Sequence, residues 1–424
     1  MAEEQEFKEK LVVHKFLNLK DIEIETNKFN IIIGPNAQGK SNLLKLLNYF
    51  KMALNTILFE LYKNKDENVD LIINGNFQYI FEDIFSFSLF KDEKFHIEYI
   101  IDVENKIKIL KKNSNDFQTI LSDSLKNKFL KLSKVYNSLD KLEFFNLLDA
   151  LETEKNKIFN NGNRFSSWFI PEARLNFYFL KDIIFNIIAY NKNMKEKLGF
   201  IYQNFLSNFE RNNNIFFDEE LSIVNVDSRN IKEIIKEILK AEYIKVGSSK
   251  FALKLENDKI IQILDSSSMQ REILPIIISL AVNLAKSKNI SFNYFIEEPE
   301  THLYPATQKD LVEFFAMVYN QTDRETRYFI TTHSPYILTS LNNLIKADNV
   351  FKAKPDKEKE IEKVVDRDKW VSFDDVSAYF LEDGKLSDIM DYEYKQIKAE
   401  EIDRISDIIM EDYDKLLDIE YGEE

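Results

Sequence analysis

One loop, residues 34 to 41, constrains the fold of this chain more than any other stretch of its sequence. Gly34 and Gly39 bracket the loop and Lys40-Ser41 closes it, which gives the pattern G-x-x-x-x-G-K-S. Three isoleucines (31–33) precede it, as in a buried strand, and leucines at helical spacing follow it. Glycines in this setting let backbone N–H groups turn toward a polyphosphate at the N-terminus of a helix. The pattern therefore predicts a strand, a phosphate-binding loop and a helix, in that order.

The residues of this loop are the first candidates for a ligand site. We expect Lys40 to reach the β- and γ-phosphates of a nucleoside triphosphate, and the hydroxyl of Ser41 to ligate Mg²⁺. The expected cofactors are therefore ATP and Mg²⁺, and the alternative is a chance glycine-rich turn. The expected phosphate-binding residues are Gly34, Pro35, Asn36, Ala37, Gln38, Gly39, Lys40, Ser41 and Asn42.

Composition excludes several classes of protein. The 424 residues include no cysteine, which excludes disulfides, a cysteine nucleophile and thiolate zinc sites. We find no signal peptide and no apolar run of spanning length, so we expect a cytoplasmic protein without a membrane partner. The net charge of -15 argues against extensive contact with nucleic-acid phosphates, although it allows a local basic groove.

Hydrophobic periodicity predicts an α/β core that is interrupted by an insertion. Residues 1–111 are expected to form the N-terminal part of the core, and residues 249–424 its C-terminal part. Residues 112–248, where apolar side chains recur at helical spacing, are expected to form a mainly helical insertion with a core strand near 167–171. The elements expected before the insertion are strands at 11–13, 22–24 and 31–33, a helix from 41 to about 62, strands at 71–73 and 85–89, and a hairpin over 95–110.

The C-terminal part of the core is expected to complete the sheet. Its expected elements are strands at 251–255 and 260–264 that re-enter the core, buried strands at 294–296 and 328–330, a charged linker over 352–363, and a hairpin over 376–389 that turns at Asp383-Gly384. A last helix is expected to carry carboxylates on one face and, on the other, Ile402, Ile405, Ile409 and Leu416.

Acidic residues follow the buried strand at 294–296. The sequence Phe295-Ile296-Glu297-Glu298-Pro299-Glu300 is expected to place carboxylates at the C-terminal edge of a sheet, where phosphates and Mg²⁺ lie in doubly wound folds. We expect Glu297 to ligate the metal or to lie in its outer shell. We expect Glu298 to polarise the attacking water as general base. The alternative is an exposed acidic turn.

A histidine follows the next buried strand, in Thr331-Thr332-His333-Ser334-Pro335. An imidazole at the edge of a sheet can hydrogen-bond a γ-phosphate, so His333 joins Glu298 as a candidate catalytic residue. By itself such a histidine is more often structural. The order of phosphate loop, acidic strand and histidine strand favours the functional interpretation.

Together with the hydroxyl-rich turn Asp265-Ser266-Ser267-Ser268-Met269-Gln270-Arg271, these motifs resemble the ABC-type ATPases, which include transporter engines, SMC proteins and RecF. The resemblance implies an ABC-type P-loop core, a mixed sheet with flanking helices, that hydrolyses ATP. It also implies a homodimer or higher homo-oligomer in which Ser267, Ser268 and Gln270 of one subunit contact the ATP of the other. Ser268 stands where the family usually has glycine, and Glu297 where it usually has aspartate.

A finer resemblance is to AAA-type ATPases related to the overcoming-lysogenisation-defect (OLD) family. It rests on the phosphate loop, the Ser-Ser-x-Met-Gln turn, Glu-Glu-Pro-Glu-Thr-His-Leu-Tyr-Pro (297–305), Thr-Thr-His-Ser-Pro (331–335) and Ile-Pro-Glu-Ala-Arg (170–174). The OLD family carries a C-terminal Toprim nuclease. Because few residues follow His333, and Asp412 and Asp414 fall on an expected helix, we expect no intrinsic nuclease.

The chain is also similar to stand-alone ATPases of anti-phage systems such as PARIS and Septu. This similarity implies a sensor or scaffold that controls a separately encoded effector nuclease, with DNA or a phage protein as the trigger. The alternative is a DNA-repair or chromosome-maintenance ATPase of the RecF or SMC kind. An insertion interrupted by a core strand cannot form long coiled-coil arms, and a chain without cysteine has no zinc hook, which argues against the SMC kind.

Two weaker candidates complete the expected site. Gln78 is a candidate for the glutamine that links the metal to the insertion, and Arg174 is a candidate for contact with a phosphate or with the dimer partner. For both side chains the alternative is a structural hydrogen bond.

Overall fold

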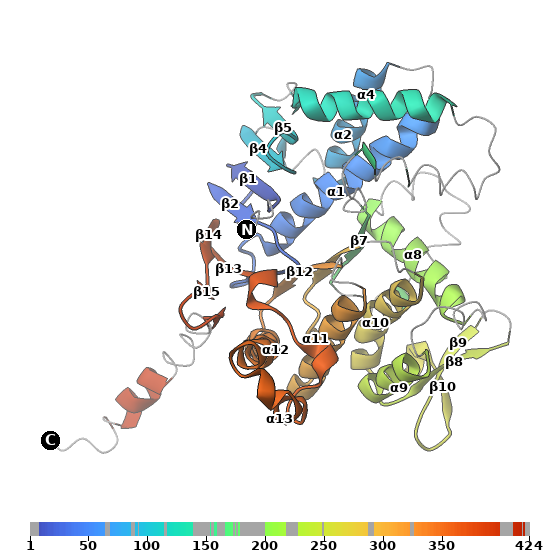
Figure 1. Cartoon of the computed structure of the whole chain (residues 1–424), viewed down its shortest axis with the longest axis vertical. Coiled ribbons are helices and arrows are strands. Elements are labelled where there is room, and N and C mark those ends of the chain that lie inside the picture. The colour runs from blue at the N-terminus through green and yellow to red at the C-terminus, as the bar shows by residue number, and fades with distance from the viewer. Residues whose placement is uncertain are drawn as a thin grey trace.

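The computed structural model describes residues 8–63, 68–85, 90–91, 93–113, 117–138, 153, 157–158, 166–172, 174, 177–178, 200–217, 228–247, 250–286, 292–322, 326–398, 410–417 and 419. Two large sheets are stacked along the long axis of the molecule, and the long helix α1 (Lys40–Lys63) lies between them (Figure 1). This arrangement confirms the expected mixed α/β architecture.

A six-stranded sheet forms the centre of the molecule. Its strands are β3 (Phe29–Ile33), β7 (Ser167–Ile170), β11 (Asn293–Glu297), β12 (Arg327–Thr332), β13 (Val376–Glu382) and β14 (Lys385–Asp388). They lie in the order β14-β13-β3-β12-β11-β7, and all neighbours are parallel except β13 and β14. The middle strands β3, β12 and β11 are buried along their whole length, as is typical of a parallel sheet covered on both faces.

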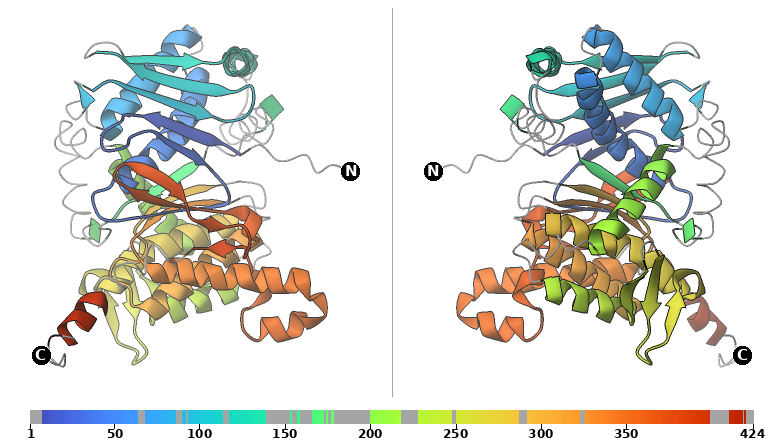
Figure 2. Two further views of the ribbon diagram at one scale, coloured as in Figure 1. Left: turned by 90° about the vertical axis from the view of Figure 1, so that its left-hand side faces the viewer. Right: turned by 90° about the vertical axis from the view of Figure 1, so that its right-hand side faces the viewer.

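A five-stranded antiparallel sheet lies on the other side of α1, in the order β2-β1-β4-β5-β6. Its strands are β1 (Lys10–His14), β2 (Ile22–Glu25), β4 (Phe95–Ile100), β5 (Lys106–Lys111) and β6 (Phe117–Leu121). Figure 2 shows this sheet stacked on the central one, with α1 and the helices α2 (Val69–Phe85) and α4 (Asp123–Ser138) near it. The sequence predicts that residues 117–121 belong to the helical insertion. They instead form β6, the last strand of this antiparallel sheet.

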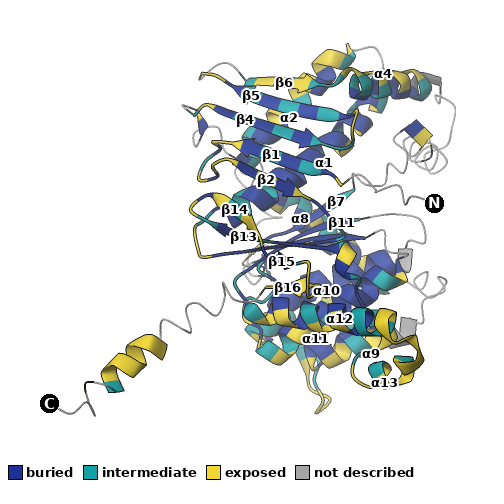
Figure 3. Ribbon diagram, turned by 60° about the vertical axis from the view of Figure 1, so that its left-hand side comes forward, coloured by how far each residue is buried: buried dark blue, intermediate teal, exposed yellow. Residues whose placement is uncertain are grey.

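The two faces of the central sheet belong to two separate hydrophobic cores. In β3, Phe29, Ile31 and Ile33 join the core below the sheet, whereas Ile32 joins the core around α1, because successive side chains of a strand point to opposite faces. Figure 3 shows buried residues, in dark blue, on both sides of the central sheet. The helices on the lower side are α8 (Phe200–Phe217), α9 (Ser228–Leu239), α10 (Ser268–Lys286), α11 (Pro305–Gln321) and α12 (Pro335–Ala353).

A buried ion cluster fastens α1 to both sheets. The carboxylate of Glu9, just before β1, lies 2.5 Å from the Lys51 ammonium of α1 and accepts a 2.7 Å bond from the Tyr99 hydroxyl of β4. The Arg327 guanidinium at the start of β12 lies 3.4 Å from the same carboxylate. Burial would raise the pKa of Glu9, but Lys51 and Arg327 outweigh it and hold that pKa at about 2.

Glu9→Gln is expected to lower the free energy of unfolding by about 3–5 kcal/mol, because it leaves the Lys51 charge buried without its counter-ion. The pKa of Glu9 is depressed by folding, so its contribution is complete above the ordinary value of 4.5 and is lost as pH falls toward about 2. Urea unfolding at neutral pH and in acid measures both effects. Glu23→Gln, which removes an exposed partner of Lys10, is the control and should cost less than about 1 kcal/mol.

Several sequence-based expectations are confirmed, and three need correction in whole or in part. The strands at 11–13, 22–24, 31–33, 294–296 and 328–330, the core strand near 167–171, the first helix and both hairpins are present. The strand expected at 71–73 is wrong, because these residues belong to α2, where Ile72, Ile73, Phe77 and Ile80 are buried together on one helical face. Of the strand expected at 85–89, Phe85 ends α2 and the other residues lie outside the described part.

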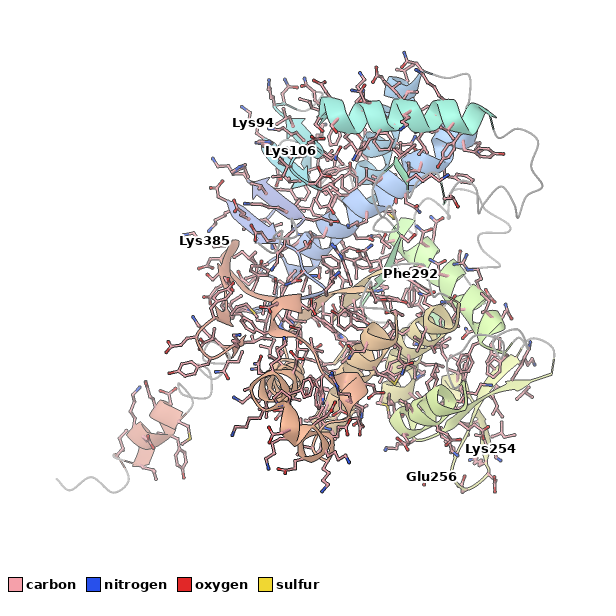
Figure 4. All side chains as sticks on the ribbon, viewed as in Figure 1. Lys94, Lys106, Lys254, Glu256, Phe292 and Lys385 are labelled. Atoms are coloured by element: carbon pink, nitrogen blue, oxygen red, sulfur yellow. The ribbon has the colours of Figure 1, made fainter. Side chains whose placement is uncertain are left out.

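The second correction concerns the strands expected at 251–255 and 260–264 to re-enter the core: both form and Leu253 is buried in the core, but neither joins the central sheet. They belong to a separate antiparallel sheet, in which each strand pairs with its neighbour along the chain. Its strands are β8 (Glu242–Val246), β9 (Lys250–Lys254) and β10 (Ile260–Gln262). The tip of this sheet, marked by Lys254 and Glu256 in Figure 4, projects from the body.

The third is the charged linker at 352–363. There α12 continues to Ala353 and a short helix α13 (Glu358–Glu362) follows, with Lys357 paired to Glu360. Of the expected last helix, residues 410–417 are helical, and Ile402, Ile405 and Ile409 lie outside the described residues. Among the helices that the structure describes, none combines the length and the apolar content that a bilayer crossing needs.

Candidate functional site

The expected site motifs meet at one edge of the central sheet. Gly34 follows β3, His333 follows β12, Glu298 follows β11 and Pro171 follows β7. These four strands are parallel neighbours in the order β3-β12-β11-β7, so their C-terminal ends share an edge. The structure therefore places the phosphate loop, the histidine and the acidic turn side by side.

The phosphate loop is held from two sides. Asn18, in the turn after β1, donates to the Ala37 carbonyl at 3.0 Å and accepts from Asn42 at 3.0 Å. On the other side, the Gln38 side chain accepts a 2.7 Å bond from the backbone N–H of Asp383, in the turn between β13 and β14. Asn18 carries no recognisable motif, and the Asp383-Gly384 turn was expected without its contact to the loop, so sequence reasoning did not find these supports.

A close backbone approach explains why glycine opens the loop. Gly34 has φ of 156°, and a Cβ on it would overlap the carbonyl oxygen of Leu381 in β13. The C-terminal hairpin therefore lies against the first residue of the loop. Any larger residue at position 34 would push β13 away from β3.

Lys40 lies at the centre of the site and is 5% exposed. Its ammonium donates to the carbonyl oxygens of Gly34 at 2.8 Å and Pro35 at 2.9 Å, and lies 3.2 Å from Nδ1 of His333. Burial lowers the pKa of Lys40, while the carboxylate of Glu298 and more distant acids oppose that shift. A polyphosphate would supply the further negative charge that such an ammonium favours.

Glu298 and His333 contact each other across two strand ends. The Glu298 Oε1 lies 2.6 Å from Nε2 of His333. The Lys40 ammonium lies 3.0 Å from the same Nε2 and 3.2 Å from Nδ1, so Nε2 contacts both Glu298 and Lys40. The bond to His333 lowers the pKa of Glu298 against the effect of its burial, so the carboxylate is ionised and can act as a base.

The backbone at Glu298 is fixed in an uncommon conformation. Its φ is 42°, in the left-handed region, and its N–H donates to the Thr331 carbonyl at 3.0 Å. The carbonyl of Glu298 accepts from Arg174 at 3.0 Å and from the Thr301 hydroxyl at 2.9 Å. Such conformations persist only where the surroundings impose them, and they gather at functional sites.

Glu297 fits a metal ligand. It is buried, and its Oε2 accepts a 3.2 Å bond from the backbone N–H of Glu172. Its other oxygen, Oε1, is buried without a hydrogen-bond partner among the described residues. Ser41 is the second residue of α1 and is half-buried. An ionised oxygen of this kind suits a hard divalent cation, so Glu297 and Ser41 fit the expected Mg²⁺.

Glu300 is a functional residue that the sequence reasoning did not select. Its Oε1 accepts from the Thr332 hydroxyl at 2.7 Å and from the backbone N–H of His333 at 2.6 Å. It thereby ties the acidic turn to the end of β12 and holds Glu298 and His333 at their pairing distance. Its place in the run Glu-Glu-Pro-Glu was the available signal.

Arg174 is a structural residue in this arrangement. Its guanidinium is fully buried and donates to the carbonyl oxygens of Glu272, Pro171, Glu297 and Glu298 at 2.7 to 3.0 Å. Its Nε also lies 3.1 Å from the Glu272 carboxylate. These contacts favour the structural alternative to a phosphate contact and connect the first turn of α10 to the acidic turn.

The hydroxyl-rich turn caps α10. The Ser267 hydroxyl accepts from the backbone N–H of Gln270 at 3.2 Å, and the Gln270 side chain accepts from the Ser267 N–H at 3.1 Å, as in a capping box. Gln270 also donates to the Leu239 carbonyl at 2.9 Å and is buried, whereas Ser267 is exposed and Ser268 is half-buried. The Ser267 hydroxyl also donates to the Gln270 side chain at 3.1 Å, so this exposed residue at a helix N-terminus is bound to Gln270 through its hydroxyl.

Gln78 is not brought to the phosphate loop. It lies on α2, and its amide donates to Glu82 one turn later at 2.8 Å. The neighbouring Phe77 contacts Tyr49, whose hydroxyl donates to the Phe77 carbonyl. Tyr49 is nine residues beyond Lys40 along α1, which is about 13 Å of helix.

A comparison with protein families identifies an ATPase domain. The family model described as AAA ATPase domain matches residues 9–338. No curated protein matches the chain.

Solved structures similar to the chain include two SMC heads and a recombination mediator protein. An SMC head bound to the C-winged helix domain of ScpA is 13% identical with a TM-score of 0.42, covering 92% of this chain and 99% of that one. An SMC head domain from Thermotoga maritima is 9% identical with a TM-score of 0.38, covering 90% and 97%. The recombination mediator protein RecF with ATP is 15% identical with a TM-score of 0.36, covering 90% and 99%.

Proposed function

Since this chain belongs to the AAA ATPase domain family, we propose that it is the ATP-hydrolysing sensor or scaffold of a prokaryotic anti-phage system, controlling a separately encoded effector. The ABC-type P-loop core expected from the sequence is confirmed by the sheet order and by the family match over residues 9–338. The effector is a nuclease in this proposal, the trigger is DNA or a phage protein, and the chain itself performs no nucleic-acid cleavage.

Each residue of the site has a role in ATP hydrolysis. Residues 34–42 hold the phosphates, and Ser41 and Glu297 hold Mg²⁺, which supplies charge stabilisation to the phosphates when bound. Glu298 is the general base for the attacking water, and His333, paired with it at 2.6 Å, contacts the γ-phosphate. Glu300 keeps the two side chains together.

The contact between the phosphate loop and the C-terminal hairpin carries the proposal of a control function. Gln38, inside the loop, holds the backbone of Asp383 at 2.7 Å, and the Lys20 N–H donates to the neighbouring Gly384 carbonyl at 2.8 Å. A phosphate that reorders the loop therefore also acts on the hairpin. The hairpin leads to surface elements that an effector can contact. Through this link, the bound nucleotide changes the conformation of those elements.

Expression of the natural locus in a phage-sensitive host tests this proposal. The locus with the wild-type chain should reduce phage plating, and the same locus with Lys40→Ala should plate phage as the empty vector does. Unchanged plating, together with sensitivity to DNA-damaging agents when the gene is deleted, would instead establish the repair or chromosome-maintenance alternative.

ATP sites are shared between two subunits in this proposal, because Ser267 is an exposed residue at a helix N-terminus. Ser267→Asp keeps a good N-cap but brings a negative charge toward the partner's ATP, so it should abolish hydrolysis. Mixing this variant with Lys40→Ala should restore activity at one composite site of each mixed dimer, in a phosphate-release assay. Ser267→Asn, an uncharged N-cap of the same size, is the control, and absence of recovery in the mixture contradicts shared sites.

A further inference from the structure

An acidic, apolar segment follows the last strands of the fold. Residues 399–424 contain eleven acidic and two basic side chains, so this segment supplies more than half of the chain's net charge of -15. Most of the segment lies outside the described residues, but residues 410–417 form a helix. Its Met410, Tyr413 and Leu416 are 57–63% exposed and follow each other at intervals of three residues, on one face. Figure 3 shows this helix apart from the body and almost wholly exposed.

An apolar groove lies between α12 and α13, with a cavity of about 600 Å³. One wall is formed by Leu344, Ala347 and Val350 of α12. The other is formed by Ile361 of α13 and by Val364 and Val365, which follow that helix. Val364 is 83% exposed. A cavity of this size accommodates several large side chains, and an exposed apolar wall marks a surface that fits a partner.

The rim of this groove is basic. Lys309, Lys346, Lys354 and Lys357 line it, against two carboxylates, Glu313 and Glu360. Both carboxylates are already paired, Glu313 with Lys309 and Lys369, and Glu360 with Lys357. Lys346 and Lys354 add positive charge at the mouth of the groove. The groove therefore complements a helix with one apolar face and with acidic side chains beside that face.

The chain tethers the acidic segment to α12, on the face of that helix opposite its groove-lining residues Leu344 and Ala347. Asn342 of α12 accepts from the Ile397 N–H at 2.8 Å and donates to the Ile397 carbonyl at 2.9 Å, and Asn349 donates to the Lys395 carbonyl at 2.9 Å. The polypeptide therefore leaves the body along the same helix that forms one wall of the groove. The eleven residues 399–409 can span up to about 36 Å, several times the diameter of a helix.

We propose that the acidic segment docks its apolar face into the groove between α12 and α13 of its own chain. Charge complementarity favours the contact, and the tether holds the segment at a high effective concentration, whereas a second copy would also lose translational freedom. The Lys346 and Lys354 side chains pair with acids of the segment, and Leu416 enters the apolar cavity. Docking takes place on α12, the helix that begins two residues after His333.

A disulfide test suits this chain because it has no cysteine of its own. Leu416→Cys combined with Val364→Cys should form a disulfide within one chain under mild oxidation, seen as a shift on a non-reducing gel. Leu416→Cys combined with Val103→Cys is the matched control, because Val103 is also exposed but lies in the β4–β5 turn of the antiparallel sheet. We expect the first pair to close about tenfold faster or more.

A charge test separates docking from chance collision. Adding Lys346→Glu and Lys354→Glu to the first cysteine pair should slow its closure at low salt, while the control pair keeps its rate. Equal closure of both pairs, or closure that ignores the lysine reversals, overturns the proposal. A disulfide that joins two chains, with a yield that rises with protein concentration, assigns the groove to a second copy and also overturns it.

Discussion

Lys40→Ala is expected to weaken ATP binding at least about 100-fold, which corresponds to roughly 3 kcal/mol. Lys40 is the cation that the phosphate-loop motif supplies, and its ammonium is buried between the Gly34 and Pro35 carbonyls and the His333 ring. A buried ammonium gains more from a phosphate than an exposed one, because water screens it less. Calorimetric titration of the purified chain with ATP measures the loss.

Lys45→Ala is the matched control for this variant. Lys45 lies on the same helix α1 and is only half-buried, and its replacement should leave the affinity for ATP unchanged. Lys40→Ala also removes two bonds within the loop, so circular dichroism and thermal unfolding must show that the chain still folds. Retained affinity in a folded Lys40→Ala chain contradicts the assignment of the phosphate loop.

The strand ends of the site could be predicted from the sequence because their signals are local. The apolar run before Gly34, the acids after Ile296 and the histidine after Thr332 each identify a buried strand and its end. Parallel pairing then brings these ends together without any knowledge of distances. The fold class followed from the same motifs.

The supports of the site could not be predicted because they depend on pairings that are distant along the chain. The strand β13 adds to the sheet beside β3, and its turn reaches Gln38 from position 383. Arg174 binds carbonyl groups of α10 and of the acidic turn, which a single sequence does not connect. At 71–73 the apolar run Leu-Ile-Ile is too short to separate a strand from a helix by its period, and packing against α1 decides for the helix.

Glu298→Gln is expected to bind ATP but to turn it over about 10²–10⁴-fold more slowly, the usual range for loss of a positioned general base. Glutamine keeps the size of the side chain and its hydrogen bond to His333, but it cannot accept the proton of the attacking water. Steady-state phosphate release measures the rate, and calorimetry confirms that binding persists. Glu172→Gln is the control, because it removes the same charge from the same acidic cluster without touching His333.

The pH dependence of hydrolysis distinguishes a base from a merely structural carboxylate. The bond from His333 lowers the pKa of Glu298, and the ionised form is the active one, so the rate should fall only as pH drops below the ordinary range of a glutamate. This acidic limb should be absent from the residual activity of Glu298→Gln. Near-normal hydrolysis by that variant would instead move the role to Glu297 or Glu300. An unchanged acidic limb would show that the proton belongs to another group, since no titration of a glutamine can produce it.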